Sequence, residues 1–187
     1  MPIVANLLRE YQDLSVRLIL VDRVVRLAEE GVDIGVRIGQ LPDSSLRAVP
    51  LASVQRVLVA SPDYLARRGA PACEADLSTH HLIAFETASL NEEWRRAGSR
   101  SQIEPRFLTN SVDATIEAAM GGLGIARLFS YHVARELADG RLVKVLTNAD
   151  EKVLPVSLVY QGGRQQSQSV RAFISAAQAA LPDRPAL

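Results

Sequence analysis

The sequence predicts an α/β fold in which helices alternate with the strands of a parallel sheet. Apolar strands and amphipathic helices follow one another through most of the 187 residues. Glycines often end these elements, and the order helix, glycine, buried strand occurs twice, within 22–39 and within 112–128. In an open sheet of this kind ligands bind at the carboxyl ends of strands, so residues 37–39 become the first candidates for a binding site.

In the first half of the chain, three helices and three strands are expected. The first helix covers 2–12, where apolar residues recur at helical spacing. A helix at 23–30 is expected to end at Gly31, because glycine accepts the left-handed backbone of a helix C-cap. Ser61 is the expected N-cap of a short helix at 62–68, which begins with proline. The strands are predicted from apolar runs at 16–21, 32–38 and 54–60.

The second half resumes this alternation after loop-like stretches around 69–71 and 86–105. A helix is expected at 112–121, with its apolar residues on one face. Another is expected at 130–138, and the last helix contains the apolar stripe of Val170, Phe173, Ile174, Ala177 and Leu181. Strands are predicted at 106–109, 122–128, 142–146 and 155–161.

The composition narrows the classes of function. The chain has 21 basic and 21 acidic residues, so its formal net charge of zero disfavours nucleic acid as its own main ligand. Cys73 is the only cysteine, which excludes an internal disulfide and a cysteine cluster for a metal. No apolar run approaches the ~18 residues that a membrane span needs, and residues 1–10 lack the features of a secretion signal. We therefore expect a cytoplasmic protein with no membrane partner.

Several short motifs follow one another in a specific order along nearly the whole chain. They are DIGVRIG (33–39), LPDSSL (41–46), RVLVASPDYL (56–65), NSVDA (110–114), GLGIA (122–126) and GRLV (140–143). In this order and spacing they resemble the effector-binding domain of a LysR-type transcriptional regulator. The resemblance implies the fold of the type 2 periplasmic binding proteins, in which two Rossmann-like α/β subdomains are joined by two crossing strands and hold a ligand between them.

The resemblance also implies how the chain is divided. Subdomain I is expected to contain 1–58 and 162–187, and subdomain II 62–155, with crossing strands at 54–61 and 156–161. Family members normally carry an N-terminal DNA-binding helix-turn-helix, which is absent from this sequence. They also have a strand before the helix at 2–12, so the first strand of subdomain I is expected to be missing here.

The candidate site combines motif positions with elementary electrostatics. Arg37, Ile38 and Gly39 lie at the end of a predicted strand, and Asn110 and Ser111 lie where another predicted strand meets a helix. A helix N-terminus attracts anions through its free N–H groups and its dipole. Charge-assisted hydrogen bonds from Arg37 or from Arg127 add to this attraction. These residues predict a small, carboxylate-bearing ligand.

Structural roles compete with each of these assignments. Asn110 or Ser111 is equally well explained as the cap of the helix at 112–121. Arg37 is able to form an ion pair with Asp43, and the facing of Arg127 in its strand is not fixed by the sequence. The glycines at 121–124 follow a helix and have no nearby lysine, so a tight turn explains them better than a phosphate loop.

Enzymatic functions have little support in the sequence. His80, His81 and His132 have no glutamate or cysteine at the spacing of a zinc motif, and no Gly-x-Ser-x-Gly elbow occurs. Trp94 is explained as a plug of a small core as well as by stacking on a ligand. We therefore expect no catalytic site, no metal and no cofactor.

The resulting hypothesis is a sensor domain for a small-molecule effector, which signals to an attached DNA-binding domain. The resemblance implies a dimer through the helices at 2–12 and 112–121, with a tetramer as a further state of the full-length protein, and contact with DNA only through the absent domain. The alternative is an extracytoplasmic solute-binding protein of a transporter, which has the same fold.

Overall fold

The computed structural model describes residues 1–21, 23–41, 45–85, 105–147, 153–162 and 167–181. The chain forms two compact units. Unit 1 comprises Met1–Val54 and Val153–Leu187, and unit 2 comprises Gln55–Lys152. Unit 1 is therefore assembled from the two ends of the chain, and strand β2 (Leu46–Ala60) contributes residues to both units.

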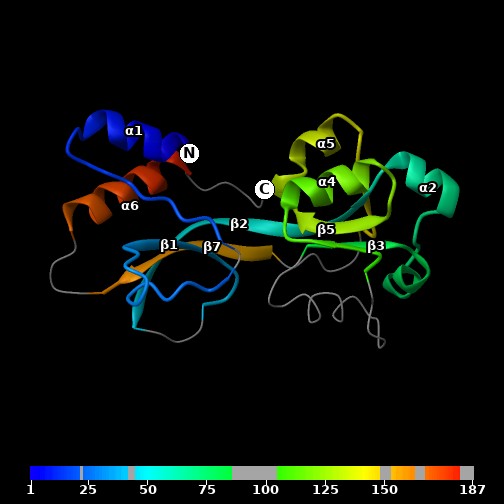
Figure 1. The fold of residues 1–187 in the computed structure, drawn as a ribbon, viewed down its shortest axis with the longest axis horizontal. Coiled ribbons are helices and arrows are strands. Elements are labelled where there is room, and N and C mark those ends of the chain that lie inside the picture. The colour runs from blue at the N-terminus through cyan, green and yellow to red at the C-terminus, as the bar shows by residue number, and fades with distance from the viewer. Residues whose placement is uncertain (22, 42–44, 86–104, 148–152, 163–166, 182–187) are drawn as a thin grey trace. The chain divides into compact units, whose positions relative to one another are not determined.

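Unit 1 combines two helices with part of the sheet (Figure 1). Its elements are α1 (Pro2–Glu10), β1 (Ile34–Ile38), β7 (Val153–Gln161) and α6 (Gln168–Ala180), together with the first part of β2. β1 pairs with β7 in antiparallel register, with Ile34 opposite Tyr160. Ser167 begins α6, because its hydroxyl oxygen accepts a hydrogen bond from the Val170 backbone N–H at 3.2 Å. The helix pair α1 and α6 packs together within this unit.

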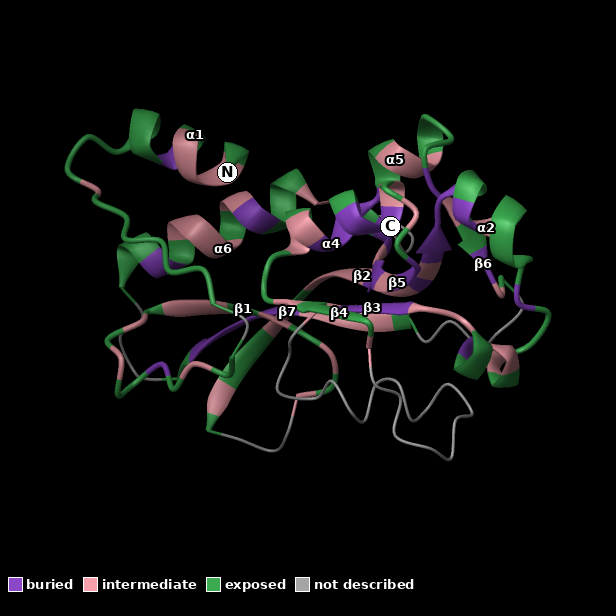
Figure 2. Ribbon diagram, turned by 45° about the vertical axis from the view of Figure 1, so that its right-hand side comes forward, coloured by how far each residue is buried: buried purple, intermediate pink, exposed green. Residues whose placement is uncertain are grey.

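Unit 2 contains the more deeply buried core (Figure 2). Its elements are the second part of β2, α2 (Pro62–Arg68), the 3-10 helix η1 (Glu74–Thr79), β3 (Leu82–Phe85), β4 (Phe107–Thr109), α4 (Val112–Met120), β5 (Ile125–Phe129), the 3-10 helix η2 (Ser130–His132), α5 (Ala134–Ala138) and β6 (Val143–Val145). β3 runs parallel to both β4 and β5, whereas β2 is antiparallel to β5 and β6. Val57, Ile83 and Leu142 are among the residues of its core.

The sheet is mixed, which corrects the expectation of a wholly parallel one. The parallel pairings are those of β3, and the ladders between β1 and β7, β2 and β5, and β2 and β6 are antiparallel. Strand–helix alternation predicted parallel pairing in general, but it did not predict β3, the strand that makes both parallel ladders. It also did not predict the antiparallel ladders, because it does not fix the direction in which β2 and β7 enter the sheet.

Two predicted elements near the N-terminus were wrong. Residues 16–21 form no strand, and their apolar side chains are exposed, Leu20 by 82%. A strand needs a neighbour for its backbone hydrogen bonds, and a run of strand-forming residues does not supply one. The described residues of the predicted helix at 23–30 form no helix, and a turn occupies 27–31. Leu27 is the only buried residue among 23–30, and a short helix in a protein depends on packing an apolar face for its stability.

Other predictions needed smaller corrections. β2 begins at Leu46 instead of 54, β5 begins at Ile125 instead of 122, and the helix predicted at 130–138 is divided into η2 and α5. Strand β3 and the 3-10 helix η1 were not predicted. The helix at 62–68 and its Ser61 cap were predicted correctly, since the Ser61 hydroxyl accepts a hydrogen bond from the Tyr64 N–H at 3.3 Å.

Candidate ligand-binding site

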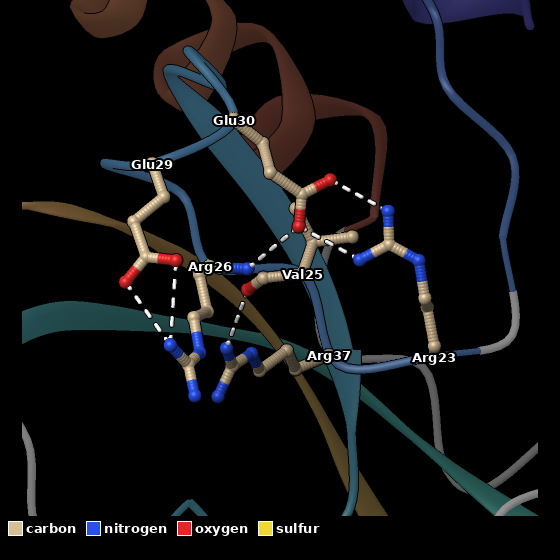
Figure 3. A network of polar contacts seen from close by, with 6 residues as sticks. All are labelled: Arg23, Val25, Arg26, Glu29, Glu30 and Arg37. Atoms are coloured by element: carbon tan, nitrogen blue, oxygen red, sulfur yellow. Dashed lines mark hydrogen bonds and ion pairs between the residues drawn. The ribbon is translucent and has the colours of Figure 1, made fainter.

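The first group of predicted site residues lies at the end of β1 in unit 1. Arg37 is half-buried and donates a hydrogen bond from Nη2 to the Val25 carbonyl oxygen at 3.1 Å (Figure 3). Ile38 is partly exposed, and the Gly39 N–H donates to the Pro155 carbonyl oxygen at 2.8 Å. Gly39 has a φ of +109°, a conformation that favours glycine. The predicted partner Asp43 lies outside the described residues.

A polar network holds the segment that receives Arg37 (Figure 3). The Glu30 carboxylate accepts two hydrogen bonds from the Arg23 guanidinium, at 2.7 and 2.6 Å, and one from the Arg26 backbone N–H at 3.2 Å. Arg26 also forms an ion pair with Glu29 at 3.2 Å. These contacts fix the turn next to Val25, so the carbonyl that orients Arg37 is itself held in place.

The same network predicts that the stability of the fold depends on pH. The Arg23 guanidinium lowers the pKa of Glu30 from 4.5 to about 2. A carboxyl whose pKa is lower in the folded state stabilises the fold above its unfolded pKa, and this stabilisation is lost as pH falls toward the folded value. We expect Arg23→Gln to lower the melting temperature at neutral pH, and the difference from the wild type to shrink between pH 4.5 and about 2. A difference that stays constant down to pH 2 would contradict this role of the pair.

The second group lies in unit 2, where β4 leads into α4. The Ser111 hydroxyl oxygen accepts a hydrogen bond from the Ala114 N–H at 3.2 Å, and Ser111 is the N-cap of α4. Its own N–H donates to Thr109 Oγ1 at 3.2 Å, and Thr115 Oγ1 donates to its carbonyl oxygen at 2.9 Å. The capping role is therefore confirmed for Ser111. Asn110 is exposed immediately before this cap.

Capping leaves groups at this junction that are suited to a ligand. The hydroxyl of Ser111 keeps its hydrogen for donation, and the first N–H groups of a helix have no acceptor within that helix. Asp113 lies in the first turn of α4 and adds negative charge there. Asp113 would repel an anionic ligand at this end of α4, so the binding of such a ligand needs a cation to offset that repulsion.

Arg127 lies on β5, half-buried and opposite Leu58 of β2. Strand β3 lies between β5 and β4, so one strand separates Arg127 from the strand that leads to Asn110 and Ser111. The structure thus places the predicted residues in two groups. Residues 37–39 are together in unit 1, and Asn110, Ser111 and Arg127 belong to unit 2.

Removing the Ser111 side chain tests how much its N-cap contributes to the stability of the fold. Ser111→Ala is expected to lower the free energy of unfolding by about 1 kcal/mol, because the Ala114 N–H loses its acceptor. Chemical denaturation measures this loss. Ser111→Gly provides the control, since glycine at an N-cap costs only a few tenths of a kcal/mol. Equal stability of the wild type and Ser111→Ala would show that the cap contributes nothing.

Sequence reasoning missed two polar arrangements. One is an open groove of about 480 Å³ between α1 and α6, lined by Leu7, Glu10, Tyr11, Gln168, Arg171, Ala172, Ser175 and Ala176. The other is the contact between Arg106 and His81, at 2.8 Å. The partners in each are far apart in the sequence, so no local pattern indicated either arrangement.

The described part of the chain also bears on the predictions about metal binding, the cysteine and membrane spans. It holds no group of three side chains able to bind a metal ion, and Cys73 is exposed. Among the described helices, none is long and apolar enough to cross a membrane. Trp94 lies outside the described residues.

Comparisons with known sequences identify the relatives of the chain. The model of the LysR substrate binding domain matches residues 1–182. The transcriptional regulator CrgA of Neisseria meningitidis is 31% identical over 178 residues, which cover 92% of this chain and 59% of the relative. The uncharacterized regulator YhjC of Escherichia coli is 33% identical over 165 residues, or 82% of this chain and 53% of the relative. Both are described as HTH-type regulators, and the chain spans little more than half their length.

Solved structures agree with the predicted fold class. The regulatory domain of CrgA from Neisseria meningitidis superimposes with a TM-score of 0.78 and 29% identity, over 96% of this chain and 90% of that domain. The full-length Vibrio cholerae virulence activator AphB gives a TM-score of 0.80 and 25% identity, over 96% of this chain and 62% of AphB. The prediction of two α/β subdomains of the type 2 periplasmic-binding-protein kind is confirmed at the level of the fold.

Proposed function

We propose a sensor function for this chain, which belongs to the LysR substrate binding domain family. In this proposal a small molecule binds the chain, and the signal passes to a DNA-binding domain elsewhere in a longer protein. The observation that carries the proposal is the family match over 1–182, together with relatives such as CrgA and YhjC that are described as HTH-type transcriptional regulators. The relatives do not favour the alternative of a transporter's solute-binding protein.

The proposed effector is a small carboxylate. Arg37 supplies a cation from unit 1, and Asn110, Ser111 and Arg127 supply donors from unit 2. The cap geometry supports this proposal, because the Ser111 hydroxyl and the N-terminal N–H groups of α4 are donors. A ligand that binds one arrangement of the two units more tightly than another would shift their populations, and only by its difference in affinity.

The remaining parts of the proposal concern the whole regulator. We propose that it works in the cytoplasm without catalysis, that its sensor domains dimerise through α1 and α4, and that only the additional domain contacts DNA. The passage of β2 through both units supports the assignment of a crossing strand near 54–61. Sedimentation at high micromolar concentration is expected to show a dimer, and a monomer alone would contradict the proposed pairing.

A thermal-shift screen of small carboxylates tests the proposed ligand. A ligand at one hundred times its Kd raises the apparent stability by about 2.7 kcal/mol, so a binding carboxylate should raise the melting temperature clearly. Arg37→Ala and Asn110→Ala are each expected to lower the affinity of the chain for that ligand. Arg135→Ala is the matched control, because Arg135 is exposed on α5, pairs with Asp139 at 3.7 Å and belongs to neither group of predicted site residues.

Two outcomes would separate errors in the site from errors in the function. If a carboxylate binds and neither Arg37→Ala nor Asn110→Ala changes its affinity, the site assignment is wrong. If the ligand binds to the full-length protein and does not change its affinity for operator DNA, the sensor function is wrong.

A further inference from the structure

A cluster of cationic side chains lies where the parallel strands of unit 2 begin. His81 precedes β3 and Arg106 precedes β4, and Arg106 Nη1 lies 2.8 Å from His81 Nδ1. Arginine is always protonated and has no acceptor, so Arg106 is the donor in this contact. The Nδ1 atom of His81 therefore accepts with its lone pair, and the imidazole is neutral in this arrangement.

The last turn of α2 adds two more guanidinium groups. Arg68 Nη2 donates to the Thr79 carbonyl oxygen at 3.3 Å, two residues before His81. Arg67 Nη2 donates to the Gly122 carbonyl oxygen at 3.1 Å, in the turn before β5. Figure 1 shows α2 beside the segment that leads from η1 into β3. Both arginines thus reach the chain segments that flank the histidine.

These arginines pair with backbone carbonyls and a histidine instead of with acids. Within the described ranges, no carboxylate oxygen lies within 4.0 Å of Arg67, Arg68 or Arg106. Asp76 of η1 uses its carboxylate for the N–H groups of Ala72 and Cys73, at 2.8 and 3.1 Å. Among the residues that the structure describes, no ion pair therefore neutralises the positive charge at this edge.

The backbone holds His81 firmly in this position. Its N–H donates to the Tyr64 hydroxyl oxygen at 2.9 Å, and its carbonyl oxygen accepts from the Ile125 N–H at 2.9 Å. Gly124 packs against the same carbonyl, where a Cβ atom would lie only 2.3 Å from the oxygen. These contacts fix the backbone from which the His81 side chain projects, so a ligand of His81 need not order that backbone.

The charges around His81 all act in one direction. Its pKa is lowered by partial burial, and then by the charges of Arg106, Arg68 and His80. The pKa of His80 is also lowered, by burial and by Arg68, with Asp76 acting in the opposite direction. An anion at this place would stabilise protonated His81 and would reduce the repulsion between the neighbouring cations.

We propose that His81, Arg106 and Arg68 form a binding site for a phosphate dianion, either free or as the monoester end of a small metabolite. The phosphate oxygens accept hydrogen bonds from both arginines and from protonated His81, and they replace the direct contact between Arg106 and His81. Binding therefore takes up one proton from solution onto the imidazole. The site lies at the start of β4, whereas Asn110 and Ser111 follow its end, so this ligand is separate from the proposed effector.

The test is an NMR titration of the histidine side chains of this chain with inorganic phosphate. Sodium chloride at equal ionic strength is the control. Phosphate is expected to raise the pKa of His81 relative to chloride, and calorimetry is expected to show proton uptake on binding. A parallel titration with glycerol phosphate distinguishes the two sources, since tighter binding than inorganic phosphate indicates a monoester and weaker binding indicates the free ion. An unchanged pKa of His81 with saturating phosphate would overturn the proposal without the need for any variant.

Substitutions give an independent test. Arg106→Gln and Arg68→Gln are each expected to raise the Kd for phosphate about tenfold or more, because each removes a hydrogen bond from a cation to the anion. Arg135→Gln is the matched control, because Arg135 is exposed on α5 of the same unit and pairs with Asp139 at 3.7 Å. Equal weakening by all three variants would indicate only a general effect of net charge and would refute the site.

Discussion

Replacing Gly124 with alanine is expected to destabilise unit 2 by about 3 kcal/mol, the upper end of the usual cost of overpacking. The added Cβ atom would lie 2.3 Å from the His81 carbonyl oxygen and 2.8 Å from its carbonyl carbon. Real Cβ atoms do not approach so closely, so β3 and β5 must separate. The separation would weaken the hydrogen bond from the Ile125 N–H to the same carbonyl. Chemical denaturation measures the loss.

Gly140→Ala is the matched control for this prediction. Gly140 has a φ of +69°, and a Cβ atom there would meet nothing within 4 Å. Its substitution therefore measures the cost of the left-handed backbone alone, about 1–2 kcal/mol. Gly122 is less suitable, because its nearest neighbour is the flexible end of Arg67. If Gly124→Ala costs no more than Gly140→Ala, the close approach of the two strands is not a constraint.

Tyr64→Ala is expected to cost about 3–5 kcal/mol, the range found for large aromatic side chains truncated in a core. Tyr64 is 2% exposed and packs in a cluster with Leu77, Leu82 and Ile125. Its hydroxyl accepts a hydrogen bond from the His81 N–H at 2.9 Å and lies 3.1 Å from His80 Nδ1. The residue therefore combines apolar packing with an acceptor for the His81 N–H.

Tyr64→Phe separates the two contributions. It keeps the ring and removes the hydroxyl, so we expect a loss of about 1–3 kcal/mol from the unsatisfied N–H of His81. Denaturation gives the two free energies, and hydrogen exchange is expected to be faster at the His81 amide in Tyr64→Phe. A variant as stable as the wild type, with unchanged exchange at His81, would show that the hydroxyl makes no net contribution.

The predictions that were correct depend on signals within a few residues. The helix α2 was expected because Ser61 stands before a proline at the first helical position, and α4 because its apolar residues share one face; Ser61 and Ser111 both cap their helices. The strand predicted at 16–21 failed because strand formation depends on a partner elsewhere in the chain. A sequence pattern measures the tendency to form a strand and contains no information on which edge is available.

The same distinction applies to the candidate site. The position of Ser111 between β4 and α4 follows from local order, so the sequence predicted it. The partner of Arg37 is the carbonyl of Val25, and no pattern of side chains indicates which backbone carbonyl a guanidinium will reach. Likewise, the contact between His81 and Arg106 exists because the parallel pairing of β3 and β4 brings them together.

The order of strands has a consequence for how the protein is made. β1 pairs with β7, with Ile34 opposite Tyr160, so β1 cannot form this ladder until β7 has been synthesised. Unit 2 is synthesised in between, and the ladders of β3 with β4 and β5, and of β2 with β5 and β6, join residues of unit 2 itself. On the ribosome, unit 2 therefore has the opportunity to fold first, while the N-terminal part of unit 1 remains incomplete. Pairing over so long a stretch of chain is intrinsically slow. A nascent chain halted before residue 153 would contain a complete unit 2 and a β1 segment that lacks its partner β7 and is accessible to chaperones.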